Sequence, residues 1–181
     1  MNGRQIDKLL ALVQCGRNDS FEELYLGTRR GVYAFLYSYY RNHELTEDAM
    51  QSVYLKIKLN IQSYRPGSNG LAWMLEIAKN LAINELKTLH RVEYGLEDGE
   101  MEARMAESGE TDELQTSEVM DVMKRTLSPE EERIMVLHVI FGYKHREIGK
   151  MLDLPIGTVT SKYKRSVEKM RHALSDDGGK E

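Results

Sequence analysis

The segment that most constrains the fold lies at residues 155–174, PIGTVTSKYKRSVEKMRHAL. At about 100° per residue, its apolar side chains fall on one narrow helical stripe, formed by Val159, Tyr163, Val167, Met170 and Leu174. The opposite side carries Ser161, Lys164, Arg165 and His172. Residues 155–174 therefore predict a helix whose two faces require different partners.

A second, shorter helix is predicted at residues 145–152, with Ile148 and Leu152 inward and a turn at 153–155. Two short helices joined by a tight turn, the second basic outside and apolar inside, are the arrangement that sets a helix into the major groove. Gly157 is expected to permit close approach of the two helices. Thr158 and Ser161 are short hydroxyls near a helix N-terminus that can meet phosphate. The alternative is an ordinary amphipathic helix whose lysines keep the surface solvated.

Charge is unevenly distributed along the chain. Residues 1–91 carry 12 cationic and 9 anionic side chains, and residues 124–174 carry 11 and 6. Residues 92–123 between them carry 1 and 11, and the tail at 175–181 carries 1 and 3. Two mildly basic blocks joined by an acidic strip favour two separate contacts with nucleic acid.

Several classes of protein find no support in the sequence. No apolar run approaches the roughly 20 residues of a membrane span, and the N-terminus is not a convincing signal peptide, so we expect a cytoplasmic protein. The single Cys15 excludes an internal disulfide, and the five histidines lack ligand spacing, so we expect no metal and no cofactor. No carboxylate pair, nucleophile with base, or Walker loop is present, so we expect no enzyme and no small-molecule substrate.

The N-terminal block predicts four helices, at 4–15, 21–41, 46–61 and 71–90, and nothing indicates a strand. The third helix has an unusual outer face, formed by Asp48, Gln51, Ser52, Leu55 and Leu59. Leucines beside polar groups on a nominally solvated face indicate a protein–protein contact. The alternative is that Leu55 and Leu59 pack on the N-terminal helix.

The fourth helix also has two faces. Its inner side is apolar, with Leu71, Leu75, Ala78, Ala82 and Leu86, whereas its outer side carries Trp73, Asn80, Asn84, Lys87 and Arg91. Aromatic, amide and cationic groups are the types that stack on bases, hydrogen-bond their edges and neutralise phosphate. Alternatively, Trp73 closes the bundle core and the remaining side chains are simply solvated.

The C-terminal block begins after a segment rich in Glu and Gly that lacks an apolar stripe. A short helix is predicted at 117–127. Ser128-Pro129-Glu130-Glu131 then supplies a capping box for a helix to about Phe141, which Gly142 ends. The resulting division is a helical domain at 1–94, an acidic flexible linker at 95–117, a helix-turn-helix domain at 118–175 and a tail at 176–181.

Four stretches together resemble one family: FEELY (21–25), EDAMQSVYLKI (47–57), AWMLEIAKNLAINELKTLHR (72–91) and LSPEEERIMVLHVIFGYKHREIGKMLDLPIGTVTSKYKR (127–165). In order and spacing they are similar to the extracytoplasmic-function (ECF) sigma factors. The resemblance covers most of both blocks. It implies an all-α fold of two small domains, sigma region 2 and the helix-turn-helix of sigma region 4.

The resemblance also implies roles for the outer faces. Asp48 and Gln51 match an acidic-x-x-Gln signature that docks on core RNA polymerase, with Ser52, Leu55 and Leu59 on the same surface. Residues 64–70 match the loop that captures a base flipped from the minus-ten element. The implied minus-ten set is Tyr64, Arg65, Ser68, Asn69, Trp73, Asn80, Asn84, Lys87 and Arg91, and the implied minus-thirty-five set is Thr158, Thr160, Ser161, Lys162, Lys164 and Arg165.

Four positions depart from the family pattern. Asn84 replaces the usual Asp, Lys87 the usual Arg and Thr160 the usual cation, and Lys144 stands where Ser or Thr normally caps a helix. The partners implied are core RNA polymerase, promoter DNA and an anti-sigma factor that holds the protein, often at the membrane. The rival hypotheses are a helix-turn-helix transcriptional regulator that acts without being a polymerase subunit, and a purely structural helical adaptor.

Overall fold

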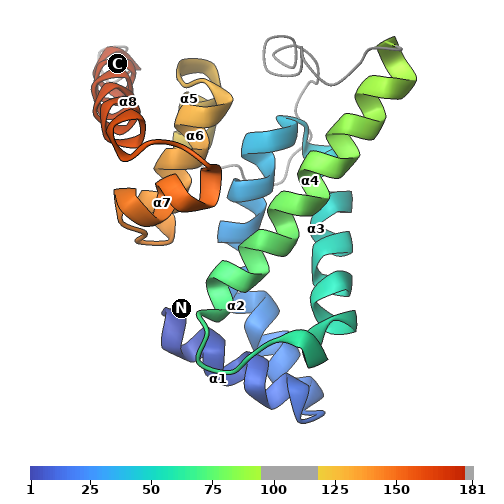
Figure 1. Cartoon of the computed structure of the whole chain (residues 1–181). Helices are drawn as coiled ribbons and strands as arrows, with labels where there is room; N and C mark the ends of the chain where they lie inside the picture. Colours follow the sequence, from blue (N-terminus) through green and yellow to red (C-terminus); the bar gives the residue numbers. More distant parts are fainter. Residues whose placement is uncertain (95–117, 178–181) are drawn as a thin grey trace. The chain divides into compact units, whose positions relative to one another are not determined.

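The computed structural model describes residues 1–94 and 118–177 and divides the chain into two compact units, Met1–Gly109 and Glu110–Glu181 (Figure 1). Every regular element in these residues is helical, which confirms the all-α, two-domain prediction. The predicted acidic linker, 95–117, lies outside the described residues, as does the end of the tail, 178–181. Among the helices of the described segments, none is both long and apolar enough to cross a membrane.

The described residues of the first unit, 1–94, form four α-helices and a short 3-10 turn. The elements are α1 (Gly3–Gln14), α2 (Asn18–Tyr40), α3 (His43–Leu59), the 3-10 turn η1 (Ile61–Ser63) and α4 (Gly70–Tyr94). Helix α4 packs against α1, α2 and α3 (Figure 1). Its predicted inner side is buried throughout, from Leu71 to Leu86.

The starts of α1 and α3 are set by asparagine caps. Asn2 forms a capping box with Gln5, in which each side chain bonds the other residue's backbone N–H, at 2.9 and 3.0 Å. Helix α3 begins at His43 rather than at the predicted Thr46, because Asn42 accepts the Leu45 N–H at 3.0 Å. Thr46 is instead buried, and its hydroxyl donates to the Asn42 carbonyl at 2.6 Å. Asn is among the strongest N-cap residues, so the earlier start is favoured.

Two tyrosines near the end of α2 belong to the core. Tyr37 and Tyr40 are buried, and the Tyr40 hydroxyl donates to Glu85 on α4 at 2.5 Å. Burial, followed by this bond and the Glu85 charge, raises the pKa of Tyr40. Buried phenols of this kind need a polar partner, and Glu85 supplies one.

The second unit contains α5 (Glu118–Thr126), α6 (Pro129–Met135), the π-helical turn η2 (Val136–Ile140), α7 (His145–Leu152) and α8 (Ile156–Asp177). The predicted capping box is confirmed: Glu131 N–H donates to Ser128 Oγ at 3.3 Å, and Ser128 N–H donates to Glu131 Oε2 at 3.0 Å. The predicted helix to Phe141 is present, but its last turn widens to π geometry. Gly142, at φ 73°, ends it as predicted.

The apolar stripe predicted on α8 is only partly correct. Val159 and Met170 are buried, but Val167 is 40% exposed and Leu174 is 45% exposed. The inward position between them is Ser166, whose hydroxyl is satisfied by donating to the Lys162 carbonyl at 2.8 Å. Because a serine can satisfy itself within a helix, the buried face is rotated away from the one that hydrophobicity alone indicates.

The glycine that permits close approach in the helix-turn-helix is Gly149, not Gly157 as predicted. A Cβ at Gly149 would lie 2.7 Å from the backbone oxygen of Leu154, whereas a Cβ at Gly157 would meet nothing within 4 Å. The Leu154 N–H donates to the Gly149 carbonyl at 2.8 Å, so the turn folds back tightly on α7. Only a residue without a side chain fits there.

We therefore expect Gly149→Ala to destabilise the second unit by about 1–3 kcal/mol, because the backbone must shift. Gly157→Ala is the matched control and should stay within about 1 kcal/mol of the unaltered protein. Thermal unfolding followed by circular dichroism measures both, and the fluorescence of Trp73 reports on the first unit. Equal effects of the two substitutions would contradict the role assigned to Gly149.

Candidate polymerase and DNA interfaces

The outer face of α3 presents two exposed leucines. Leu55 is 58% exposed and Leu59 is 71% exposed, with Asp48 and Gln51 exposed and Ser52 half-buried on the same helix. The opposite side of α3 is buried through Val53 and Ile57. The alternative that the two leucines pack on the N-terminal helix is therefore wrong. Apolar side chains ringed by polar ones are typical of a protein-binding patch.

The outer face of α4 is polar along its length. Asn80, Asn84, Lys87 and Arg91 are all exposed, at the spacing of one helix face. The sequence analysis missed Glu76, an exposed carboxylate on this face that accepts a bond from Asn80 Nδ2 at 3.4 Å. The sequence did contain the signal: residues four apart lie on the same face of a helix, so Glu76 should share the face of Asn80.

Trp73 neither lies fully in the core nor stands free. It is half-buried, and its ring lies 5.2 Å from that of Tyr64, centroid to centroid. Tyr64 is 2% exposed, so its ring supports Trp73 from beneath the surface. Burial, and secondarily the hydrogen bond to Asp7, raises the pKa of Tyr64 to about 12.

The loop at 64–70 exposes the remaining predicted residues. Arg65, Ser68 and Asn69 are all exposed, and the Ser68 N–H donates to the Arg65 carbonyl at 3.1 Å. Asn69 adopts a left-handed conformation, φ 71°, and its Oδ1 accepts the Ala72 N–H at 3.1 Å. Asn69 therefore already has a structural role as a cap at the start of α4.

On α8, the predicted reading face is exposed at Ser161, Lys164 and Arg165. Thr158 and Thr160 are half-buried. The Ser161 hydroxyl donates to the Thr158 carbonyl at 3.0 Å, and the Thr160 hydroxyl donates to the Ile156 carbonyl at 2.9 Å. The two cations are therefore more available to a partner than the hydroxyls are.

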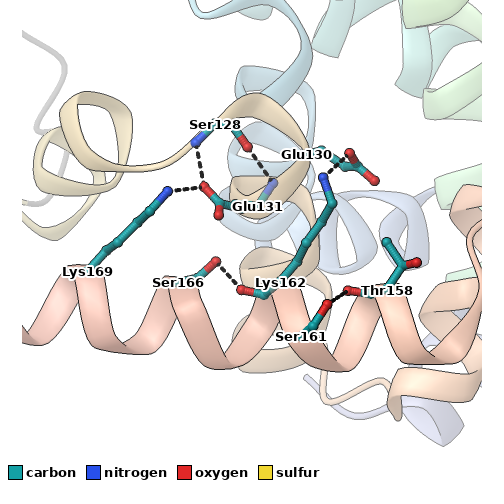
Figure 2. A network of polar contacts seen from close by, with 8 residues as sticks. All are labelled: Ser128, Glu130, Glu131, Thr158, Ser161, Lys162, Ser166 and Lys169. Carbon is teal, nitrogen blue, oxygen red and sulfur yellow. Dashed lines mark hydrogen bonds and ion pairs between the residues drawn. The ribbon is translucent and has the colours of Figure 1, made fainter.

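Lys162, the remaining predicted residue, is engaged within the domain. Its ammonium lies 2.5 Å from Glu130 on α6, and a second ion pair, 2.8 Å long, joins Lys169 to Glu131. Figure 2 shows the two pairs side by side. Burial alone would raise the pKa of Glu131, but Lys169 and Ser128 outweigh it and hold that pKa below its usual value. The two pairs tie α8 to the start of α6.

Three rings, one each from η2, α7 and α8, form a cluster. His138 and His145 lie 4.9 Å apart, and Tyr163 lies 4.5 Å from His138 and 4.9 Å from His145, centroid to centroid. His145 Nδ1 is 3.1 Å from Thr160 Oγ1. Burial, and secondarily the charge of His138, lowers the pKa of His145. Among the described residues, no group of three or more His, Cys, Asp or Glu side chains could hold a metal ion.

The lowered pKa of His145 predicts acid sensitivity in the second unit. Because the folded state binds a proton on His145 less readily than the unfolded state does, its stability falls as pH drops through about 6.5 toward the folded-state pKa. We expect the melting temperature at pH 5.5 to lie below that at pH 7.5, and the difference to shrink in His145→Phe. An unchanged difference in that variant would show that another group is responsible.

Two family models match the chain. Sigma-70 region 2 matches residues 24–92, and Sigma-70, region 4 matches residues 117–170. The first match contains the exposed faces of α3 and α4, and the second contains the helix-turn-helix. One match therefore lies in each unit of the structure.

Relatives extend the similarity along the whole chain. The sigma factor CarQ of Myxococcus xanthus is 26% identical over 162 residues, which is 89% of this chain and 92% of the relative. The ECF sigma factor SigW of Bacillus subtilis is 25% identical over 182 residues, covering 94% and 97%. The ECF sigma-E factor of Escherichia coli (strain K12) is 28% identical over 171 residues, covering 88% and 89%.

Solved structures share the fold. The sigma factor RpoE of Bartonella quintana, in complex with the anti-sigma factor NepR, superposes with a TM-score of 0.62 at 20% identity, covering 86% of this chain and 96% of that one. CnrH, in complex with the cytosolic domain of CnrY, gives 0.61 at 17% identity, covering 96% and 99%. With both sigma regions matched in order, the chain belongs to the sigma-70 family, in its extracytoplasmic-function (ECF) group.

Proposed function

We propose that this alternative sigma factor divides its work among three surfaces: α3 docks on core RNA polymerase, α4 with loop 64–70 captures the melted minus-ten strand, and α8 reads the minus-thirty-five duplex. The observation that carries the proposal is the exposure of Leu55 and Leu59 beside Asp48 and Gln51. A DNA-binding protein without a protein partner has no need of such a patch.

Strand capture is supported by the chemistry of the outer face of α4. Bases stack on aromatic rings, with about 1–3 kcal/mol per base, and Trp73 offers a half-buried ring held by Tyr64. Asn80 and Asn84 offer amides to base edges, and Lys87 and Arg91 follow them toward the end of α4, where cations meet phosphate. Trapping of unstacked bases drives opening, at a few kcal/mol per base, and the protein is a polymerase subunit rather than an enzyme.

Duplex recognition is assigned to α8. Lys164 and Arg165 are exposed, and Arg can make two parallel bonds to guanine O6 and N7. Lys162 reaches DNA only if it exchanges Glu130 for a phosphate. Because phosphate contacts release counterions, affinity for promoter DNA should fall steeply with salt.

The protein's regulator and location follow from the same proposal. Two structurally similar proteins form complexes of this kind: the sigma factor RpoE with the anti-sigma factor NepR, and CnrH with the cytosolic domain of CnrY. We expect an anti-sigma factor to cover the α3 patch of this protein in the same way as polymerase does. The protein then acts in the cytoplasm, where its polymerase works, and can be held at the membrane by a membrane-anchored inhibitor.

The second candidate function is a helix-turn-helix regulator that binds duplex DNA alone, which the exposed basic face of α8 would also serve. Transcription in vitro with purified core polymerase and a promoter library separates the two. A sigma factor redirects the core enzyme to specific start sites. A regulator binds DNA without polymerase and creates no new start site with core enzyme.

A substitution in the α3 patch tests polymerase docking. Leu55→Asp and Leu59→Asp should each weaken binding to core polymerase by at least about 2 kcal/mol, because central apolar anchors carry most interface energy. Both side chains are exposed, so the fold should be unaffected. Leu26→Asp, at a 55% exposed leucine on α2, is the matched control. Equal losses for Leu26 and Leu55 in a binding titration would refute the assignment.

Arg165→Ala tests duplex reading. We expect about 1–3 kcal/mol less discrimination between the best minus-thirty-five element and its single-base variants, with polymerase binding intact. Arg171→Ala removes the same charge from another exposed position of α8 and should leave discrimination unchanged. Loss of polymerase binding in Arg165→Ala would show that this residue has a different role.

A further inference from the structure

The loop at 64–70 is attached at both ends to α1, a helix that precedes the region 2 match at 24–92. Two side chains of α1, Asp7 and Gln14, make these attachments. They lie seven residues apart, so they project from the same side of the helix about two turns apart. Nothing in the similarity of residues 24–92 to region 2 assigns them a role.

Gln14 fixes the entry to the loop. Its Nε2 donates to the carbonyls of Ile61 and Tyr64, at 3.1 and 3.0 Å, and approaches that of Gln62 at 3.4 Å. In return, Gln62 Nε2 donates to the Gln14 carbonyl at 3.2 Å. The side-chain amide of Gln14 therefore contacts carbonyl groups of both η1 and the first residue of the loop.

Asp7 fixes the exit. Its Oδ1 accepts the Tyr64 hydroxyl at 2.8 Å and also the N–H of Gly70, the first residue of α4. Gly70 is buried against α1, where a Cβ would overlap Leu10 and would lie 2.9 Å from Asp7 Oδ1. One carboxylate oxygen therefore joins the tyrosine at the start of the loop to the backbone at its end.

These attachments hold the two ends of the loop together and leave its middle exposed. Tyr64, fixed by Asp7 and by Gln14, supports the Trp73 ring at 5.2 Å. Arg65, Ser68 and Asn69 then project from a short segment whose ends cannot separate. Binding costs less free energy when a loop is ordered before the ligand arrives.

We infer that α1 is a positioning element for strand capture, in which Asp7 and Gln14 set the shape of loop 64–70 and thereby the base preference at the minus-ten element. The inference rests on the proposed sigma-factor function of α4 and the loop. Neither residue needs to touch DNA, since both act through Tyr64, Gly70 and the η1 carbonyls.

Gln14→Glu is the sharpest test, because it replaces the donor that faces three carbonyls with an acceptor while keeping the shape. In transcription with core polymerase, we expect the ratio of activity between the best minus-ten element and its single-base variants to fall about fivefold, the worth of roughly one hydrogen bond. The corresponding ratio for minus-thirty-five variants should not change. Gln14→Ala should change the minus-ten ratio in the same direction, and it replaces Gln14→Glu as the test if that variant folds poorly.

Asp7→Asn has a readout in the free protein. The neutral side chain accepts more weakly, so the pKa of Tyr64 should fall below about 12, although burial still raises it. The difference between the ultraviolet absorbance titrations of the variant and the unaltered protein measures this fall, because both contain the other nine tyrosines. Emission from Trp73, the only tryptophan in the sequence, should change in the same variant. Lys8→Ala, at an exposed neighbour on α1, should leave both signals and the minus-ten ratio unchanged.

The outcomes separate the inference from the function on which it rests. If the unaltered protein fails to redirect core polymerase, the proposed function is wrong whatever the variants do. If it succeeds, but Gln14→Glu and Gln14→Ala keep the wild-type minus-ten ratio, the inference is wrong. If the Gln14 variants instead lose activity equally on all promoters, in proportion to their lost affinity for polymerase, α1 has a purely structural role and the inference is likewise wrong.

Discussion

The structure depends on one constraint, that α4 has large apolar residues along one side only and is buried on that side. Residues from Leu71 to Leu86 on that side anchor α4 against α1, α2 and α3. The other side then faces outward, and its exposed polar residues are available to an extended ligand. Single-stranded nucleic acid is a ligand of that shape, with a repeating charge and a flat base at each step.

The helical spacing of apolar residues predicted most of the fold, because side-chain burial follows that spacing closely wherever large apolar residues recur. It failed where small or polar residues decide the packing. Ser166 is buried in place of Val167 because it satisfies its own hydroxyl, and Gly149 rather than Gly157 makes the tight approach. Asp7 and Gln14 could not be recognised from sequence, since their partners lie 47 to 63 residues away and only the tertiary fold brings them together.

Several residues assigned to DNA already have partners in the free protein. Lys162 is paired with Glu130, Thr160 lies beside His145, and Asn69 caps α4. Resemblance to a family identifies the positions expected to contact DNA. It does not identify the contacts within the protein that compete with DNA, because these depend on neighbours such as Glu130. For Lys162, DNA binding is then an exchange of partners, whose net gain is smaller than the new contact alone. None of the contacts described above involves the side chain of Arg165 or Lys164. These two cations therefore carry the larger share of the proposed recognition.

The two exposed leucines of α3 have a consequence for growth temperature. Burial of apolar surface is driven mainly by the release of ordered water near room temperature, and this driving force weakens on cooling. The docking proposed for Leu55 and Leu59 should therefore lose strength in the cold, whereas the phosphate contacts proposed for α8 do not share this dependence. Competition among sigma factors for a limited pool of core enzyme would then shift with temperature, independently of any inhibitor.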